Sequence, residues 1–168
     1  MNEIGTVVVG VDGSSGSRAA LDHALQDAAR RGARLRVVAA VPLPDYWSMA
    51  YGMGPLPPAE FDADVRNEAQ LMVDDVVAAH PDLCTRVPVT VDAVNGSPAE
   101  VLLWASQDAD LLVLGHRGRG GFSSVLLGSV GLQCVLRAVC PVTIVRPVVA
   151  RAEPDAVRSR ASAAPAPV

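Results

Sequence analysis

The chain has 168 residues, of which 50% are hydrophobic and only 4% aromatic, and its formal net charge is −4. This length predicts one domain with a substantial core, and the surplus of Val, Ala and Leu suits a parallel sheet buried on both faces. The acidic balance, without any basic run, argues against nucleic acid as a partner. All 14 basic residues are arginines, which excludes chemistry that depends on a lysine.

Membrane and targeting signals are not evident in the sequence. No apolar run reaches the roughly 18 residues of a membrane-spanning helix, and the first residues lack the basic start and apolar core of a signal peptide. We therefore expect a cytoplasmic protein that does not enter a membrane. Cys84, Cys134 and Cys140 lack metal-type spacing, and for the last two we expect a role as small buried hydrophobic residues.

Strand and helix signals alternate along the first half of the chain. A β-branched run predicts a strand over Thr6–Val11, and Ser17 is a candidate N-cap for a helix that Gly32 ends. A second strand follows over Leu35–Val41. Residues 42–58 are rich in Pro, Gly, Met and aromatic side chains, which suits either a lid over a ligand or a loop packed over the sheet edge.

The alternation continues through the second half. A helix over Phe61–Ala79 precedes a strand over Val87–Val94, and Ser97 followed by Pro98 predicts the N-cap and first residue of the next helix. The later elements, in order, are a strand over 110–114, a helix over about 129–138 and a strand over 142–145. We expect one folded domain over 1–148 and a disordered tail over 149–168, where Ala, Arg, Pro and Ser dominate.

Five strands that alternate with four helices predict a single open, doubly wound α/β sheet with helices on both faces. Ligands of such sheets bind beyond the carboxyl ends of the strands, where the winding reverses. The two turns with ligand-binding character follow the strands at 6–11 and 110–114. We expect the strand order 3-2-1-4-5, because it makes these two strands neighbours at the point of reversal.

The most informative segment is GHRGRGGFSSVLLGS over residues 115–129, with the spacing G-x2-G-x9-G-S. It follows a buried strand and leads into a helix. Glycines let the backbone approach a ligand closely, and the free N–H groups at a helix N-terminus attract anions. The segment therefore predicts a phosphate-binding loop and, with it, nucleotide binding.

Three segments carry a family resemblance: VVVGVDGS at 7–14, LLVLGHRGRGGFSSVLLGSV at 111–130 and CPVTIVRP at 140–147. Together they resemble the universal stress protein family, and in particular its ATP-binding branch. The resemblance implies the α/β fold predicted above, a regulatory protein that binds ATP, and a homodimer through antiparallel pairing of Val142–Arg146. An apolar edge strand gives the dimer an independent reason, since exposed edges tend to be paired.

The resemblance also implies site residues. Asp12 would lie beside the adenine and ribose, the backbone of Val41 would recognise the adenine edge, and Gly115 would let the ribose approach. The phosphates would be held by Gly118, Gly128, Ser129 and Val130. Ser129 is also expected to be the N-cap of its helix, Arg117 to neutralise phosphate charge, and His116, a departure from the family pattern, to have no chemical role. A Mg²⁺ ion would bind mainly through phosphate and water, because no second carboxylate is evident beside Asp12.

We expect a binding protein rather than an efficient enzyme. A fast ATPase needs a residue that positions water and an arranged cationic clamp; the first is not identifiable and lysine is absent, so hydrolysis would be slow. A weak ATPase or nucleotidyl transferase remains an alternative function. AMP or cyclic AMP remains an alternative ligand, because a glycine loop does not distinguish ligands by their number of phosphates. A response-regulator receiver is excluded by the missing lysine, and a flavodoxin-like protein is disfavoured because its phosphate loop follows the first strand.

Overall fold

The computed structural model describes residues 4–41, 58–118 and 127–147. Its elements, in chain order, are β1 (Thr6–Val11), α1 (Ser15–Arg31), β2 (Arg34–Val41), α3 (Pro58–Ala78), α4 (Pro81–Cys84), β3 (Val89–Asn95), α5 (Pro98–Ala105), β4 (Leu111–Gly115), α6 (Ser129–Arg137) and β5 (Val142–Val145). The loop predicted at 42–58, apart from its last residue, and the tail predicted at 149–168 lie outside the described residues.

The five strands form one parallel sheet in the order β3-β2-β1-β4-β5, which confirms the predicted topology. β1 is the central strand and is buried along its whole length. It pairs with β2 on one side and β4 on the other. The two strands that precede the predicted ligand-binding turns are therefore neighbours, and their carboxyl ends meet at one edge of the sheet.

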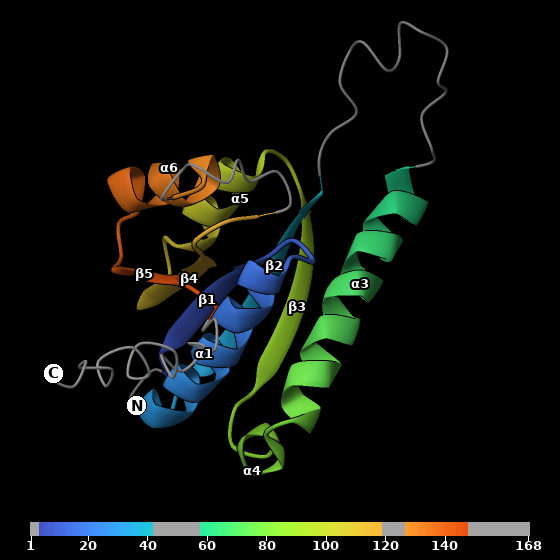
Figure 1. The fold of residues 1–168 in the computed structure, drawn as a ribbon, viewed down its shortest axis with the longest axis vertical. Coiled ribbons are helices and arrows are strands. Elements are labelled where there is room, and N and C mark those ends of the chain that lie inside the picture. Colours follow the sequence, from blue (N-terminus) through green and yellow to red (C-terminus); the bar gives the residue numbers. More distant parts are fainter. Residues whose placement is uncertain (1–3, 42–57, 119–126, 148–168) are drawn as a thin grey trace, which may run out of the picture.

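Helices cover both faces of the sheet (Figure 1). Val7 and Val9 of β1 face α1 and α3 in the larger core cluster, whereas Val8 faces α5 and α6 in the smaller one. This alternation follows from the two-residue period of a strand. All three valines are completely buried, and each contributes roughly 1.5–3 kcal/mol to folding.

Two helices begin at a different residue from the one predicted. The N-cap of α1 is Ser14, whose Oγ accepts a hydrogen bond from Ser17 N–H at 3.1 Å; the prediction of Ser17 as N-cap is wrong. Both positions are serines, so the sequence fits either choice. The N-cap of α6 is Gly128, and Ser129 is the first helical residue, so the expectation of Ser129 as N-cap is also wrong.

Other differences are small. α3 begins at Pro58, three residues before the predicted start, and the short helix α4 was not predicted. β3 begins at Val89 instead of Val87, because the N–H of Val87 bonds to the carbonyl of Leu83 and closes the preceding turn. No helix in the described part of the chain combines the length and apolar character that crossing a membrane requires.

Candidate functional site

A cavity of about 520 Å³ opens at the carboxyl ends of β1 and β4. Its volume is in the range of small-molecule sites, which are typically about 300–1,000 Å³. The structure brings seven of the eight predicted site residues to its wall: Asp12, Gly115, Arg117, Gly118, Gly128, Ser129 and Val130. Residues far apart in the sequence therefore meet where the topology of the sheet predicts a ligand.

Asp12 forms the turn between β1 and α1. Its Oδ1 accepts hydrogen bonds from the backbone N–H of Ser14 at 3.1 Å and from the Ser14 hydroxyl at 2.6 Å. Gly13 lies at φ 80°, a left-handed conformation that glycine adopts without strain. Asp12 thus organises the N-terminus of α1 and also lines the cavity.

The glycines of the loop differ in the contacts that a side chain would make at each position. A Cβ at Gly115 would lie 2.6–2.9 Å from backbone atoms of Gly16 and Ser17 in the first turn of α1, and a Cβ at Gly118 would collide with Asp12 Oδ2. Backbone contacts therefore require a glycine at 115, whereas a side chain at 118 would have to displace the Asp12 carboxylate. A Cβ at Gly128 would lie 3.6 Å from its nearest neighbour, the carbonyl oxygen of His116, so the protein leaves space there.

The N-terminus of α6 forms the polar end of the cavity. Gly128 N–H donates to the carbonyl of His116 at 2.9 Å, which holds the helix start beside the end of β4. The first N–H groups of a helix have no partner within the helix and carry a partial positive charge. Since Ser129 and Val130 line the cavity, these donors and the Ser129 hydroxyl suit an anion such as phosphate.

Val41 is the predicted site residue that does not line this cavity. It ends β2 and is only 1% exposed, and its backbone carbonyl accepts a hydrogen bond from Gly96 N–H at 3.0 Å. Three preceding residues of β2, Val38, Ala39 and Ala40, line the cavity instead.

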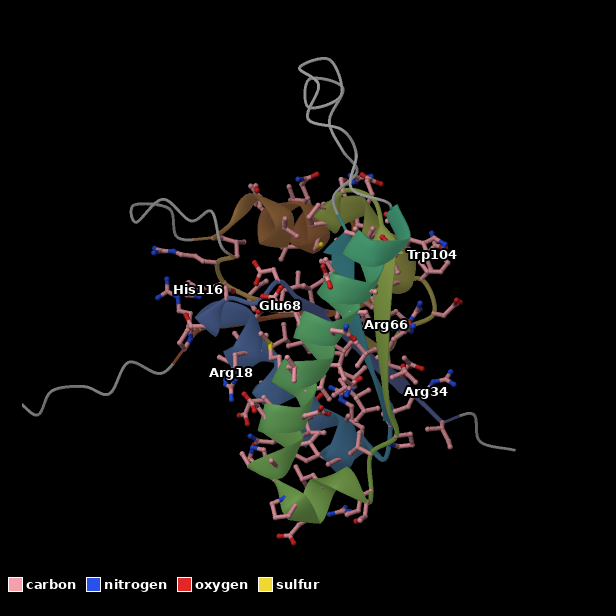
Figure 2. The ribbon with its side chains drawn as sticks, turned by 90° about the vertical axis from the view of Figure 1, so that its right-hand side faces the viewer. Arg18, Arg34, Arg66, Glu68, Trp104 and His116 are labelled. Carbon is pink, nitrogen blue, oxygen red and sulfur yellow. The ribbon has the colours of Figure 1, made fainter. Side chains whose placement is uncertain are left out.

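Sequence reasoning missed the contribution of α3 and α5. Val65, Glu68 and Ala69 line the cavity from α3, and Pro98 and Leu102 line it from α5. Their spacing is that of ordinary helix faces, so no sequence signal separates them from core residues. Glu68, labelled in Figure 2, is an acidic residue that lines the same cavity as Asp12.

His116 follows β4 directly. Burial, together with the positive charges of Arg117 and Arg146, lowers the pKa of its side chain below 6.5. Its Nδ1 atom is buried and has no hydrogen-bond partner within the described residues. Protonation of the imidazole is therefore disfavoured. In the part of the chain that the structure describes, no three His, Cys, Asp or Glu side chains gather as a metal site.

Comparison with known proteins identifies the family. The model of the universal stress protein family matches residues 3–146. The chain belongs to this family.

The relatives of this universal stress protein include a universal stress protein of Mycobacterium tuberculosis, 37% identical over 140 residues, which cover 83% of this chain and 45% of the relative. The chain thus spans less than half the length of this relative. A universal stress protein of Thermus aquaticus is 35% identical over 146 residues, which cover 84% of this chain and 98% of the relative.

Solved structures agree with the fold. The universal stress protein UspA from Lactobacillus plantarum matches with a TM-score of 0.63 and 24% identity, covering 86% of this chain and 100% of that one. A universal stress protein crystallised in complex with cAMP matches with a TM-score of 0.58 and 28% identity, covering 85% of this chain and 97% of that one.

Proposed function

We propose that this universal stress protein binds an adenine nucleotide, with ATP as the principal ligand, and acts as a nucleotide-dependent regulatory module in a stress response. The observation that carries the proposal is the open N-terminus of α6 at the end of a largely apolar cavity. Phosphates would bind the N–H groups of Ser129 and Val130, with Arg117 on the same wall. The base would lie between Val38–Ala40 of β2 and Val65 and Ala69 of α3, as apolar walls suit an aromatic ring.

A magnesium ion fits this arrangement. Asp12 and Glu68 line the cavity, and carboxylate and phosphate oxygens are the ligands that Mg²⁺ prefers. The ion would neutralise phosphate charge when bound. Asp12 also holds the α1 turn through Ser14, so this carboxylate is positioned before any ligand arrives.

We propose slow or absent hydrolysis. Fast phosphoryl transfer requires an arranged cationic clamp and a group that orients water. Arg117 is the one cationic side chain among the described residues that line the cavity, and lysine does not occur in the chain. Cyclic AMP is a second candidate ligand, supported by the solved relative in complex with cAMP at 28% identity.

We also propose a homodimer through residues 142–146. β5 is an outer strand of the sheet, so its outward-facing backbone groups are available to a second copy. Analytical ultracentrifugation of the protein and of an Ile144→Pro variant would test this. The proline would remove a backbone donor, and an unchanged oligomeric state in a folded variant would contradict the proposal.

The site is tested by Gly128→Val. The side chain would project where phosphate must approach, while the protein leaves space for the Cβ. Isothermal titration of ATP, AMP and cyclic AMP into nucleotide-free protein should give binding that falls by at least about a hundredfold in the variant. Gln133→Val, one turn further along α6, is the matched control and should bind as the original protein does. Equal affinity of the Gly128 variant would refute the site.

A further inference from the structure

In the part of the chain that the structure describes, helices cover only part of the sheet face beneath α5. α5 has 8 residues, and Leu102 packs against Gly10 at the carboxyl half of β1. The amino-terminal half of β2 and the adjoining part of β3 extend beyond this cover. Their side chains on this side, with the outward-facing tryptophan of α5, form a surface that we call the Trp104 face: Arg34, Arg36, Thr90, Asp92 and Trp104.

Trp104 is the apolar centre of this face. The residue is 58% exposed. Aromatic residues are rare in this chain, which has 2 tryptophans and 4 other aromatic residues. The guanidinium carbon of Arg36 lies 5.4 Å from the centre of the Trp104 ring, and Arg36 Nε donates to Asp92 Oδ2 at 2.7 Å. The indole is thus held against the protein on one side and open on the other. Tryptophan and arginine are the residue types that most often dominate binding energy at protein interfaces.

The charge of this surface is positive, although the whole chain is acidic. Arg34 Nε donates to the hydroxyl of buried Thr6 at 2.7 Å and makes no ion pair within the described residues. Arg66 reaches the outer edge of β3 from α3. Arg36 and Arg66 share the carboxylate of Asp92, at 2.7 and 4.0 Å, whereas Arg34 does not pair with it. Figure 2 shows Trp104, Arg66 and Arg34 along one side of the molecule and Arg18 on the other.

Two further carboxylates among the described residues lie beside this surface: Asp110 Oδ2 accepts a hydrogen bond from Thr6 N–H at 2.7 Å, and Asp62 Oδ2 accepts one from the Asn95 side chain at the β3 edge at 2.8 Å. The carboxylate of Asp110 lies beside Gly5 and near Ala33, and Ala33 belongs to the core on the α1 side. At the β3 edge, Arg66 donates to the carbonyl of Val91 at 3.2 and 2.9 Å. The Val91 carbonyl is therefore not available to an added strand, and recognition at this face would use its exposed side chains.

We propose that the Trp104 face binds an acidic segment of a partner protein. An apolar side chain of the partner packs on the free side of the Trp104 indole, and flanking carboxylates pair with Arg34 and Arg66. Arg36 stays bonded to Asp92 and keeps the indole in place. The proposal does not depend on nucleotide binding.

Fluorescence anisotropy with three labelled 12-residue peptides tests the proposal. Each peptide has a central Leu-Phe pair flanked by Glu, Gln or Lys. The Glu peptide should bind at least about tenfold more tightly than the Gln peptide, and its affinity should fall as salt is raised. Trp104→Ala and Arg34→Gln should each weaken it by about tenfold or more. Leu71→Ala and Arg18→Gln, exposed residues outside the Trp104 face, are the matched controls and should leave affinity unchanged.

Three results would overturn the proposal. The first is equal binding of the Glu and Gln peptides, since the arginines would then have no part in recognition. The second is Glu-peptide binding that the Trp104 and Arg34 variants do not weaken. The third is binding of a single-stranded RNA oligonucleotide that these variants abolish while the Glu peptide does not bind, because the face would then recognise nucleic acid.

Discussion

Replacing Gly115 by Ala tests whether glycine is needed at this position for the packing of β4 against α1. The added Cβ would lie 2.6 Å from the carbonyl carbon and 2.7 Å from the carbonyl oxygen of Gly16, and 2.9 Å from Ser17 N. All three are backbone atoms, so no side-chain rotation relieves the overlap. Gly115 does not have a positive φ, so alanine would otherwise be preferred by roughly 0.5–1 kcal/mol in a strand. Overpacking that displaces backbone costs about 1–3 kcal/mol.

We expect Gly115→Ala to lower the free energy of unfolding by about 2 kcal/mol, which corresponds to a fall in Tm of roughly 4–8 °C for a chain of this length. Urea unfolding of nucleotide-free protein, followed by circular dichroism, measures this effect. Gly128→Ala is the matched control: its Cβ has space, and we expect a loss of only about 0.5 kcal/mol from the poorer N-cap. If the two variants are equally stable, the packing of β4 against α1 is not the reason for Gly115.

Two serines and a histidine give further predictions. Ser14→Ala should cost about 1 kcal/mol of stability, because it removes the cap of α1. Ser129→Ala should weaken ATP binding without that cost, because Gly128 occupies the N-cap position of α6; a loss of 1 kcal/mol or more would contradict this geometry. The lowered pKa of His116 predicts stability that is complete above about pH 6.5 and falls as the pH decreases, because the unfolded chain takes up the proton more readily. Urea unfolding from about pH 7.5 to 5.5 should show a shallower decline for His116→Gln, and an unchanged slope would refute the assignment.

Much of the candidate site could be predicted because its elements are local in sequence. The strand at Leu111–Gly115, the glycine spacing and the helix that begins at Ser129 occupy one continuous segment, so the sequence already indicates an anion site there. The role of each glycine could not be predicted in this way. Gly115 and Gly118 contact residues at the start of α1 and in the turn before it, about a hundred positions away in the chain. The sequence of the loop does not indicate these neighbours.

Helix caps, too, could be predicted only in part from the sequence. Ser14 and Ser17 have the same chemistry, and the choice between them depends on where the chain leaves β1 and how Asp12 bonds the turn. The walls contributed by α3 and α5 depend on which helix covers which strand. Val65, Glu68 and Ala69 have the spacing of any helix face, so their position in the cavity follows from packing alone.

The sequence by itself determined the alternation of strands and helices, the parallel sheet and the position of the glycine-rich loop, because apolar periodicity and glycine spacing act within short segments. Only the tertiary structure decided that Glu68 joins Asp12 on the cavity wall, that Val41 is buried away from it, and that Trp104 stands exposed above Arg36. The physical reason is that these relations join residues from different elements. Close packing of the whole sheet with its helices sets their separations, and no local pattern encodes them.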